Sequence, residues 1–236
     1  MAAVSGRISA PIGWSESRPS LSQSPTNDGN SLLNQAVQMM RPTPSWTCRL
    51  LPAIRRRLNS AYARVRWPGV SFGRGCDVRS GLWLYRAPTG VVSFGPECVI
   101  DRGMSVEAYG MLAVGARTVF GHHCTLASQS SVTIGDDCLI AELVSIRDHD
   151  HCFERIDLVT RSQGMTVASV VIGRNVWIGA KVTVAKGVTI GDNAIVGANA
   201  VVTRDIPANS IAVGIPARVV RMRDGSTLGL SASQLS

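Results

Sequence analysis

The sequence predicts an all-β solenoid, in which the chain winds into a stack of flat-sided coils. From Ile172 onward, every sixth residue is branched and apolar, and a small or β-branched residue follows four positions later. The first set is Ile172, Ile178, Val184, Ile190, Val196 and Val202, and the second is Val176, Val182, Val188, Ala194 and Ala200. A helix needs apolar spacing near 3.6 residues and an ordinary strand needs alternation, so an unbroken period of six fits neither. It is typical of repeated coils, in which six residues form one side and one corner.

The same unit recurs upstream with a longer period. Phe72, Phe94, Val114 and Ile134 each precede a glycine and begin a coil, and their spacings are 22, 20 and 20 residues. The spacing between Ile172 and Ile190 is 18 residues. Each long coil is therefore three hexads with a two-residue bulge at one corner, and the predicted solenoid covers residues 70–222.

One long interruption, from about Arg147 to Val170, separates the coils that begin at Ile134 and Ile172. A solenoid buries its core by stacking like coils, so an insertion has to leave the stack at a corner. Loops of this length are uncommon unless they serve a function. The predicted excursion, residues 147–170, holds two of the four histidines of the chain, His149 and His151.

Composition indicates one soluble domain with a tail at each end. The chain has 236 residues, enough for one core of roughly 150 residues. Residues 1–45 are rich in Ser, Pro, Asn and Gln, which predicts a disordered extension without a secretory signal, and residues 223–236 read as a flexible tail. No apolar run reaches the length of about 18 residues that a membrane span needs.

Four cysteines occupy the small inward position of a hexad, where a compact thiol packs like alanine. These are Cys76, Cys98, Cys124 and Cys138. The pattern favours buried free thiols over disulfides or a metal site, and with them a reducing, cytoplasmic setting.

A basic segment at residues 46–69 precedes the coils. Seven arginines and no acid lie between Arg41 and Arg66, which accounts for most of the net charge of +8. Apolar residues at helical spacing accompany them: Leu50, Leu51, Ile54, Leu58, Tyr62 and Val65. Two interpretations stay open, of which we favour the first: a helix that caps the open end of the solenoid, or a basic amphipathic helix (46–66) at the inner face of the membrane. Nucleic acid is not expected, because no recognition motif accompanies the charge.

The C-terminal coils resemble a known family. Residues 175–179 read Asn-Val-Trp-Ile-Gly and residues 214–218 read Gly-Ile-Pro-Ala-Arg. Together with the hexads, these segments resemble the hexapeptide-repeat acyltransferases, specifically the maltose/galactoside O-acetyltransferase-like and polysaccharide acetyltransferase branch. The resemblance implies a left-handed parallel β-helix, a homotrimer, and acetyl-CoA bound in a groove between neighbouring subunits. It implies no metal.

Moving an acetyl group from a thioester to a hydroxyl requires a base, and histidine has a suitable pKa. His149, in the run Asp-His-Asp-His from Asp148 to His151, aligns with the catalytic histidine of the family. His151 is the second candidate. The acid that orients the ring stays open between Asp148, Asp150 and Glu142.

The resemblance also implies cofactor contacts at Trp177, Ala180, Ala198, Thr203, Arg204, Arg218 and Arg221. The two alanines are expected beside the pantetheine arm, and Thr203 and Arg204 in the next corner. Arg218 and Arg221 are expected at the adenosine phosphates, since arginine suits phosphate. Trp177 is expected at a corner, lining the groove or packing between subunits.

The predicted acceptor side departs from the family. Gly121 stands where the sugar acetyltransferases carry an acceptor-binding asparagine, and His122 and His123 follow it. A simple galactoside is therefore a less suitable acceptor than a larger capsular, exopolysaccharide or lipid-linked glycan. The predicted function is acetyl-CoA-dependent O-acetylation of such a glycan. The alternatives are a zinc enzyme similar to γ-carbonic anhydrases and a non-catalytic scaffold.

Overall fold

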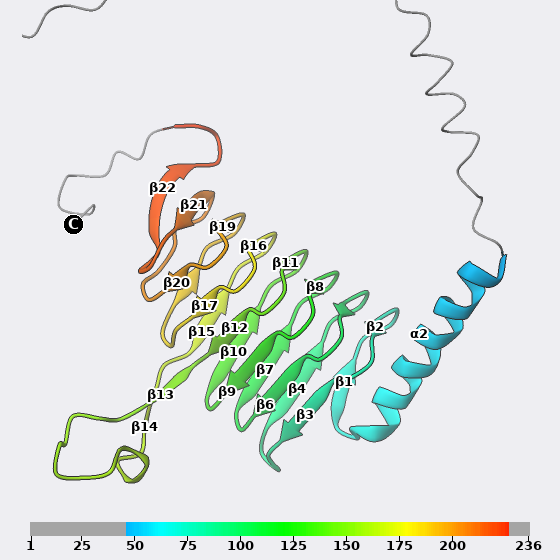
Figure 1. The fold of residues 1–236 in the computed structure, drawn as a ribbon, viewed down its shortest axis with the longest axis horizontal. Helices are drawn as coiled ribbons and strands as arrows, with labels where there is room; N and C mark the ends of the chain where they lie inside the picture. The colour runs from blue at the N-terminus through cyan, green and yellow to red at the C-terminus, as the bar shows by residue number, and fades with distance from the viewer. Residues whose placement is uncertain (1–45, 227–236) are drawn as a thin grey trace, which may run out of the picture. The chain divides into compact units, whose positions relative to one another are not determined.

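The computed structural model describes residues 46–226, which form a helix followed by a stack of three-sided coils (Figure 1). The extension predicted at residues 1–45 and most of the tail predicted at residues 223–236 lie outside the described residues. Each coil contributes one short strand to each of three sheets, which we call A, B and C. The corners between them are called A–B, B–C and C–A, in the order in which the chain meets them.

Sheet A contains β1 (Val70–Phe72), β4 (Val91–Phe94), β7 (Met111–Val114), β10 (Ser131–Ile134), β15 (Val170–Ile172) and β18 (Thr189–Ile190). Sheet B contains β2 (Asp77–Val78), β5 (Val99–Ile100), β8 (Val119–Phe120), β11 (Leu139–Ile140), β16 (Trp177–Ile178), β19 (Ile195–Val196), β21 (Ser210–Val213) and β22 (Arg218–Met222). Sheet C contains β3 (Trp83–Arg86), β6 (Ser105–Ala108), β9 (Thr125–Ser128), β12 (Ser145–Arg147), β17 (Thr183–Val184) and β20 (Val201–Val202). Pairing within the sheets is parallel, except that β22 runs antiparallel to β21.

The hexad residues form the core between the three sheets. All the residues that the six-residue period selects between Ile172 and Val202 are at most 2% exposed. The inward cysteines Cys76, Cys98, Cys124 and Cys138 are also buried and free. Burial raises the pKa of the Cys124 thiol to about 11, so it packs as a neutral group.

Corners A–B and B–C are uniform, with four residues between the strands in each of the six coils. Their third residue has a positive φ, as at Asn175 (53°), Asn193 (60°) and Asn199 (60°). Asparagine tolerates this left-handed conformation better than most residues. At corner A–B the amide of Asn175 also donates to Asn193 Oδ1 at 2.8 Å, and Asn193 donates to Asn209 at 3.0 Å.

Corner C–A varies in length. The core residues Val106 and Val114, which face each other across this corner, are eight positions apart, whereas Val184 and Ile190 are six apart. The predicted bulge is therefore at corner C–A. The excursion leaves from the same corner, and contains β13 (His149–His151), a short 3₁₀ turn η1 (Thr160–Ser162) and β14 (Met165–Val167). β13 and β14 form an antiparallel pair that projects from the stack (Figure 1).

The helix α2 (Trp46–Arg66) lies at the end of the stack opposite β22 (Figure 1). It contacts the first coil through Ala63, which is 1% exposed, and through Ser60. The Ser60 hydroxyl donates to the Cys76 carbonyl at 3.1 Å and accepts from the Val78 N–H at 3.0 Å. Within residues 46–226, no helix combines the length and apolar character needed to cross a membrane.

Candidate active site

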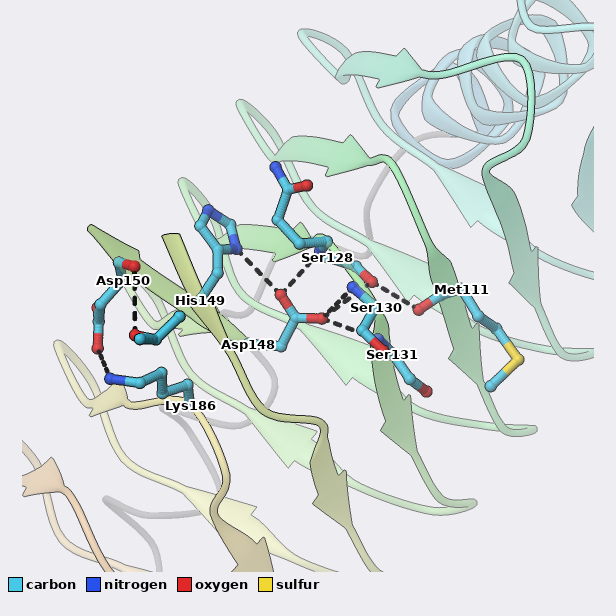
Figure 2. Close-up of polar contacts among 10 residues, drawn as sticks. Met111, Ser128, Ser130, Ser131, Asp148, His149, Asp150 and Lys186 are labelled. Carbon is cyan, nitrogen blue, oxygen red and sulfur yellow. Dashed lines mark hydrogen bonds and ion pairs between the residues drawn. The ribbon is translucent and has the colours of Figure 1, made fainter. Parts of the chain in front are cut away.

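Asp148 lies at the root of the excursion and is fully buried, with no exposed side-chain surface. Its carboxylate accepts hydrogen bonds from the backbone N–H groups of Gln129, Ser130 and Ser131 at 2.7, 2.7 and 2.8 Å (Figure 2). Gln129 and Ser130 form corner C–A between β9 and β10, and Ser131 is the first residue of β10. The Asp148 carbonyl also accepts from the Ala168 N–H at 2.8 Å, which joins the two ends of the excursion.

Burial by itself would raise the pKa of Asp148, because it disfavours the charged carboxylate. The hydrogen bonds from Gln129, His149, Ser130 and Ser131 outweigh that effect and hold the pKa below its ordinary value. Asp148 is therefore an ionised, acceptor-only group at neutral pH.

His149 is the next residue, and its ring Nδ1 lies 3.0 Å from Asp148 Oδ1 (Figure 2). Because the carboxylate can only accept, Nδ1 must carry the proton in this pair. The neutral ring then has a lone pair on Nε2. The side chain is 16% exposed, so the ring is held at the surface of corner C–A and is not buried in the core.

The structure resolves which of the three candidate acids lies beside the ring. Asp150 forms an ion pair with Lys186 at 2.7 Å (Figure 2). Glu142 lies on corner B–C, where its carbonyl accepts from the Lys181 N–H at 2.9 Å. His151 is exposed and pairs across the excursion with Met165. Of the three acids, Asp148 alone contacts His149 within the described chain.

Sequence reasoning missed the groups that hold Asp148. The 20-residue period of the long coils could have indicated these groups, because it places Ser128 beside Asp148 in the stack. The register agrees, since Arg147 pairs with Ala127. The Ser128 hydroxyl donates to the Met111 carbonyl at 2.8 Å and lies 3.5 Å from Asp148 Oδ2.

The predicted cofactor residues fall into three groups, of which the first lies on sheet B. Trp177 pairs with Ile195, Ile195 with Ile211, and Ile211 with Arg221, so all four share one row. Arg218 is on the same strand as Arg221. The prediction that Trp177 sits at a corner is wrong: it is a strand residue of β16, 53% exposed, because it alternates with the buried Ile178.

The second group follows corner B–C. The Ala180 carbonyl accepts from the Asn199 N–H at 2.8 Å, which places the turns of Ala180 and Ala198 in adjacent coils. His122 and His123 occupy the same corner nearer α2, since the His122 carbonyl accepts from the Leu143 N–H at 3.0 Å.

The third group, Thr203 and Arg204, follows β20 and lies exposed at corner C–A. His149 is on this corner too, two coils nearer α2. Within one chain, sheet C separates these residues from those at corner B–C. Across residues 46–226, no three His, Cys, Asp or Glu side chains are grouped so that they could hold a metal ion.

The sequence is similar to a family model and to several known proteins. A family model described as bacterial transferase hexapeptide (six repeats) matches residues 169–204. The putative lipopolysaccharide biosynthesis O-acetyl transferase WbbJ of Escherichia coli is 34% identical over 147 residues, which cover 58% of this chain and 75% of that protein. Nodulation protein L of Rhizobium meliloti is 37% identical over 138 residues, which cover 58% of this chain and 74% of that protein.

A solved structure shows the same fold. It is a variant of AntD, an N-acyltransferase from Bacillus cereus in complex with dTDP and coenzyme A. The TM-score is 0.60 with 19% identity, over 69% of this chain and 88% of AntD. This likeness confirms the predicted left-handed parallel β-helix. With the sequence relatives, it leads to one conclusion: the chain belongs to the hexapeptide-repeat acetyltransferase family.

Proposed function

We propose that this protein transfers an acetyl group from acetyl-CoA to a hydroxyl of a glycan, with His149 as the general base. The observation that carries the proposal is the contact between buried Asp148 and His149 Nδ1. It fixes the tautomer that leaves Nε2 free to accept a proton. The name of the relative WbbJ, an O-acetyl transferase of lipopolysaccharide biosynthesis, supports a glycan acceptor.

In the proposed reaction, the acceptor hydroxyl loses its proton to Nε2 of His149 as its oxygen attacks the thioester carbon. A carbon–oxygen bond forms and the carbon–sulfur bond breaks. The proton on Nε2 then passes to the departing CoA thiolate, so the ring ends as it began. Asp148 stabilises the imidazolium between the two transfers, because it is ionised and 3.0 Å away. His151 and Asp150 have no part in these steps.

A homotrimer would complete this site. His149 lies at corner C–A, whereas Trp177, Ala180, Ala198, Arg218 and Arg221 lie on sheet B and corner B–C. We propose that corner B–C of one subunit lies beside corner C–A of its neighbour, so that acetyl-CoA binds between them. Arg218 and Arg221 would then contact the phosphates of the cofactor, and His122 and His123 the acceptor.

Neither alternative class is named among the reported relatives, whereas WbbJ is named an O-acetyl transferase. A zinc enzyme would need histidines gathered around one ion. In the described chain the pair His122 and His123 is on corner B–C and the pair His149 and His151 is on the excursion, so only the subunit interface proposed above could gather them. Stoichiometric zinc in the purified protein would therefore overturn the acetyltransferase proposal. A scaffold would give no role to the buried Asp148 that holds the ring of His149.

The test compares His149→Ala with His151→Ala, using release of free thiol from acetyl-CoA with a panel of sugars, oligosaccharides and lipid-linked glycans. We expect His149→Ala to lower kcat by about two to four orders of magnitude, with unchanged acetyl-CoA affinity. His151→Ala should retain turnover close to the original protein. Near-normal turnover of His149→Ala would refute the assignment of the base.

A further inference from the structure

The helix α2 contacts the coils through a narrow face of small residues. Ser60 and Ala63 are buried, and Trp67, just after the helix, packs against the core. The apolar residues that predicted an amphipathic helix are on a different face. The cap interpretation therefore accounts for only part of the helix.

The apolar stripe of α2 faces away from the coils. Its described members are Ile54, Leu58, Tyr62 and Val65, which are 46%, 64%, 63% and 81% exposed. Spacings of three and four residues place them along one side of the helix. Leu50 and Leu51 lie outside the residues whose side chains are described. A continuous apolar stripe on a solvent-facing helix marks a surface that binds a partner.

Arginines border this stripe on both sides. Successive helical residues are turned by about 100°, so the residue before and the residue after a stripe member lie on opposite flanks. Arg57 precedes Leu58 and Arg64 precedes Val65, whereas Arg55 follows Ile54 and Arg66 follows Val65. All four of these arginines are exposed, Arg64 also donates to the Gly73 carbonyl of the first coil at 3.1 Å, and α2 contains no acidic residue.

This arrangement discriminates between possible partners. A second copy that packed stripe to stripe would bring arginines against arginines without an acid to neutralise them, which is unfavourable. Nucleic acid would satisfy the arginines but would leave the apolar stripe in water. An anionic bilayer satisfies both, because acyl chains accept the stripe while phosphate headgroups meet the flanking charges.

We propose that α2 binds the surface of an anionic lipid bilayer, with the stripe of Ile54, Leu58, Tyr62 and Val65 inserted at the headgroup boundary. The helix lies along the surface and does not span it. His149 follows the fourth coil of the stack, whereas α2 covers the first, so this contact leaves corner C–A uncovered. The proposal is independent of acetyl transfer and concerns where the enzyme works.

The experiment is flotation of the full-length protein with vesicles of phosphatidylcholine, with or without one third phosphatidylglycerol, in the absence of acetyl-CoA. The stripe variant is Leu58→Glu with Val65→Glu. The matched control is Ile156→Glu with Val159→Glu, at exposed apolar positions of the excursion. We expect the original protein and the control to float with the anionic vesicles only, and the stripe variant to lose at least tenfold in partitioning. Arg55→Gln with Arg66→Gln should lose about fivefold per arginine.

Circular dichroism and turnover of a soluble acceptor should be unchanged in the stripe variant, which separates lipid binding from folding and catalysis. Absence of flotation by the original protein would overturn the proposal. Equal losses in the stripe variant and the control would also overturn it. So would a change of oligomeric state in light scattering, which would make the stripe an interface between copies. Tighter binding of the original protein to duplex DNA than to anionic vesicles would assign α2 to nucleic acid instead.

Discussion

The stacked coils differ from the excursion in one physical respect: the corners of the coils have no spare room. At corner A–B, a Cβ added to Gly135 would lie 2.6 Å from the backbone oxygen of Gly173 in the next coil. On the excursion from corner C–A, a Cβ added to Gly164 would meet no atom within 4 Å. The close approach of successive coils stabilises the stack, and it extends to corner C–A, where a Cβ added to Gly110 would collide with the Ser130 carbonyl oxygen.

The candidate catalytic pair lies where the stack tolerates change. The bulges of the long coils and the whole excursion leave from corner C–A, and so does the Asp148–His149 pair. The pair is nevertheless held by the stacked coils, because the N–H donors to Asp148 are Gln129 and Ser130 at corner C–A and Ser131 at the start of β10. The regular coils therefore supply a fixed frame, and the variable corner supplies the chemical groups.

The largest expected effect on stability comes from closing the space at a tight corner. Gly135→Ala should lower the free energy of unfolding by about 3 kcal/mol or more, because its new methyl group meets backbone that cannot rotate away. Gly164→Ala is the matched change on the excursion, where φ of +85° is the only obstacle, and should cost about 1 kcal/mol. Urea unfolding of both variants measures the difference. Equal costs would show that the tight corners yield as readily as the excursion.

The next effect concerns the buried carboxylate at corner C–A. Asp148→Asn replaces an oxygen acceptor with an NH₂ group facing backbone donors, and should lower the free energy of unfolding by about 2–3 kcal/mol at neutral pH. Asp205→Asn is the control, since Asp205 accepts one N–H, from Thr189 at 2.7 Å, and is exposed. A loss in Asp148→Asn no larger than that in Asp205→Asn would contradict the role given to the buried carboxylate.

The same residue predicts a dependence on pH. The pKa of Asp148 is held below its ordinary value in the folded protein, so its stabilising contribution is full above the unfolded pKa of about 3.9. That contribution is lost as the pH falls through the lower, folded pKa. The free energy of unfolding, measured from neutral to acid pH, should therefore fall more steeply for the original protein than for Asp148→Asn. Parallel curves would remove Asp148 from the acid response.

The sequence predicts those features of the structure that depend on residues close together in the chain, and it fails for features that depend on contacts between distant residues. The hexads predict the coils and the core because an apolar residue recurs at the inward positions. The excursion and His149 follow from a break in that repeat. The acid beside His149 could not be chosen from the sequence, because the hydrogen bonds that hold Asp148 come from Gln129, Ser130 and Ser131, which precede it by 17 to 19 residues.

The corner expected for Trp177 is wrong, and the cap interpretation of α2 accounts for only part of that helix. The hexads predict a corner position for Trp177 instead of its place in β16, because the boundary between turn and strand within a hexad is not marked by residue type. A capping helix is expected to bury its apolar stripe, because burial normally selects the apolar face of a helix. The first coil instead accepts Ser60, whose hydroxyl bridges the Cys76 carbonyl and the Val78 N–H. That contact depends on unpaired backbone groups at the open end of the stack, which no helical pattern reveals.

The smallest expected effect tests whether side-chain hydrogen bonds at corner A–B add to the stability that backbone packing provides. Asn193 and Asn199 share a φ of 60°, so replacing either with alanine strains the backbone equally, by about 1 kcal/mol. Asn193 also accepts from Asn175 and donates to Asn209, whereas Asn199 has no place in this ladder. Asn193→Ala should therefore cost more than Asn199→Ala, by roughly 0.5–1 kcal/mol in urea unfolding, since exposed hydrogen bonds contribute little. If the two variants unfold alike, corner A–B is held by its backbone alone, as corner B–C is at Asn199.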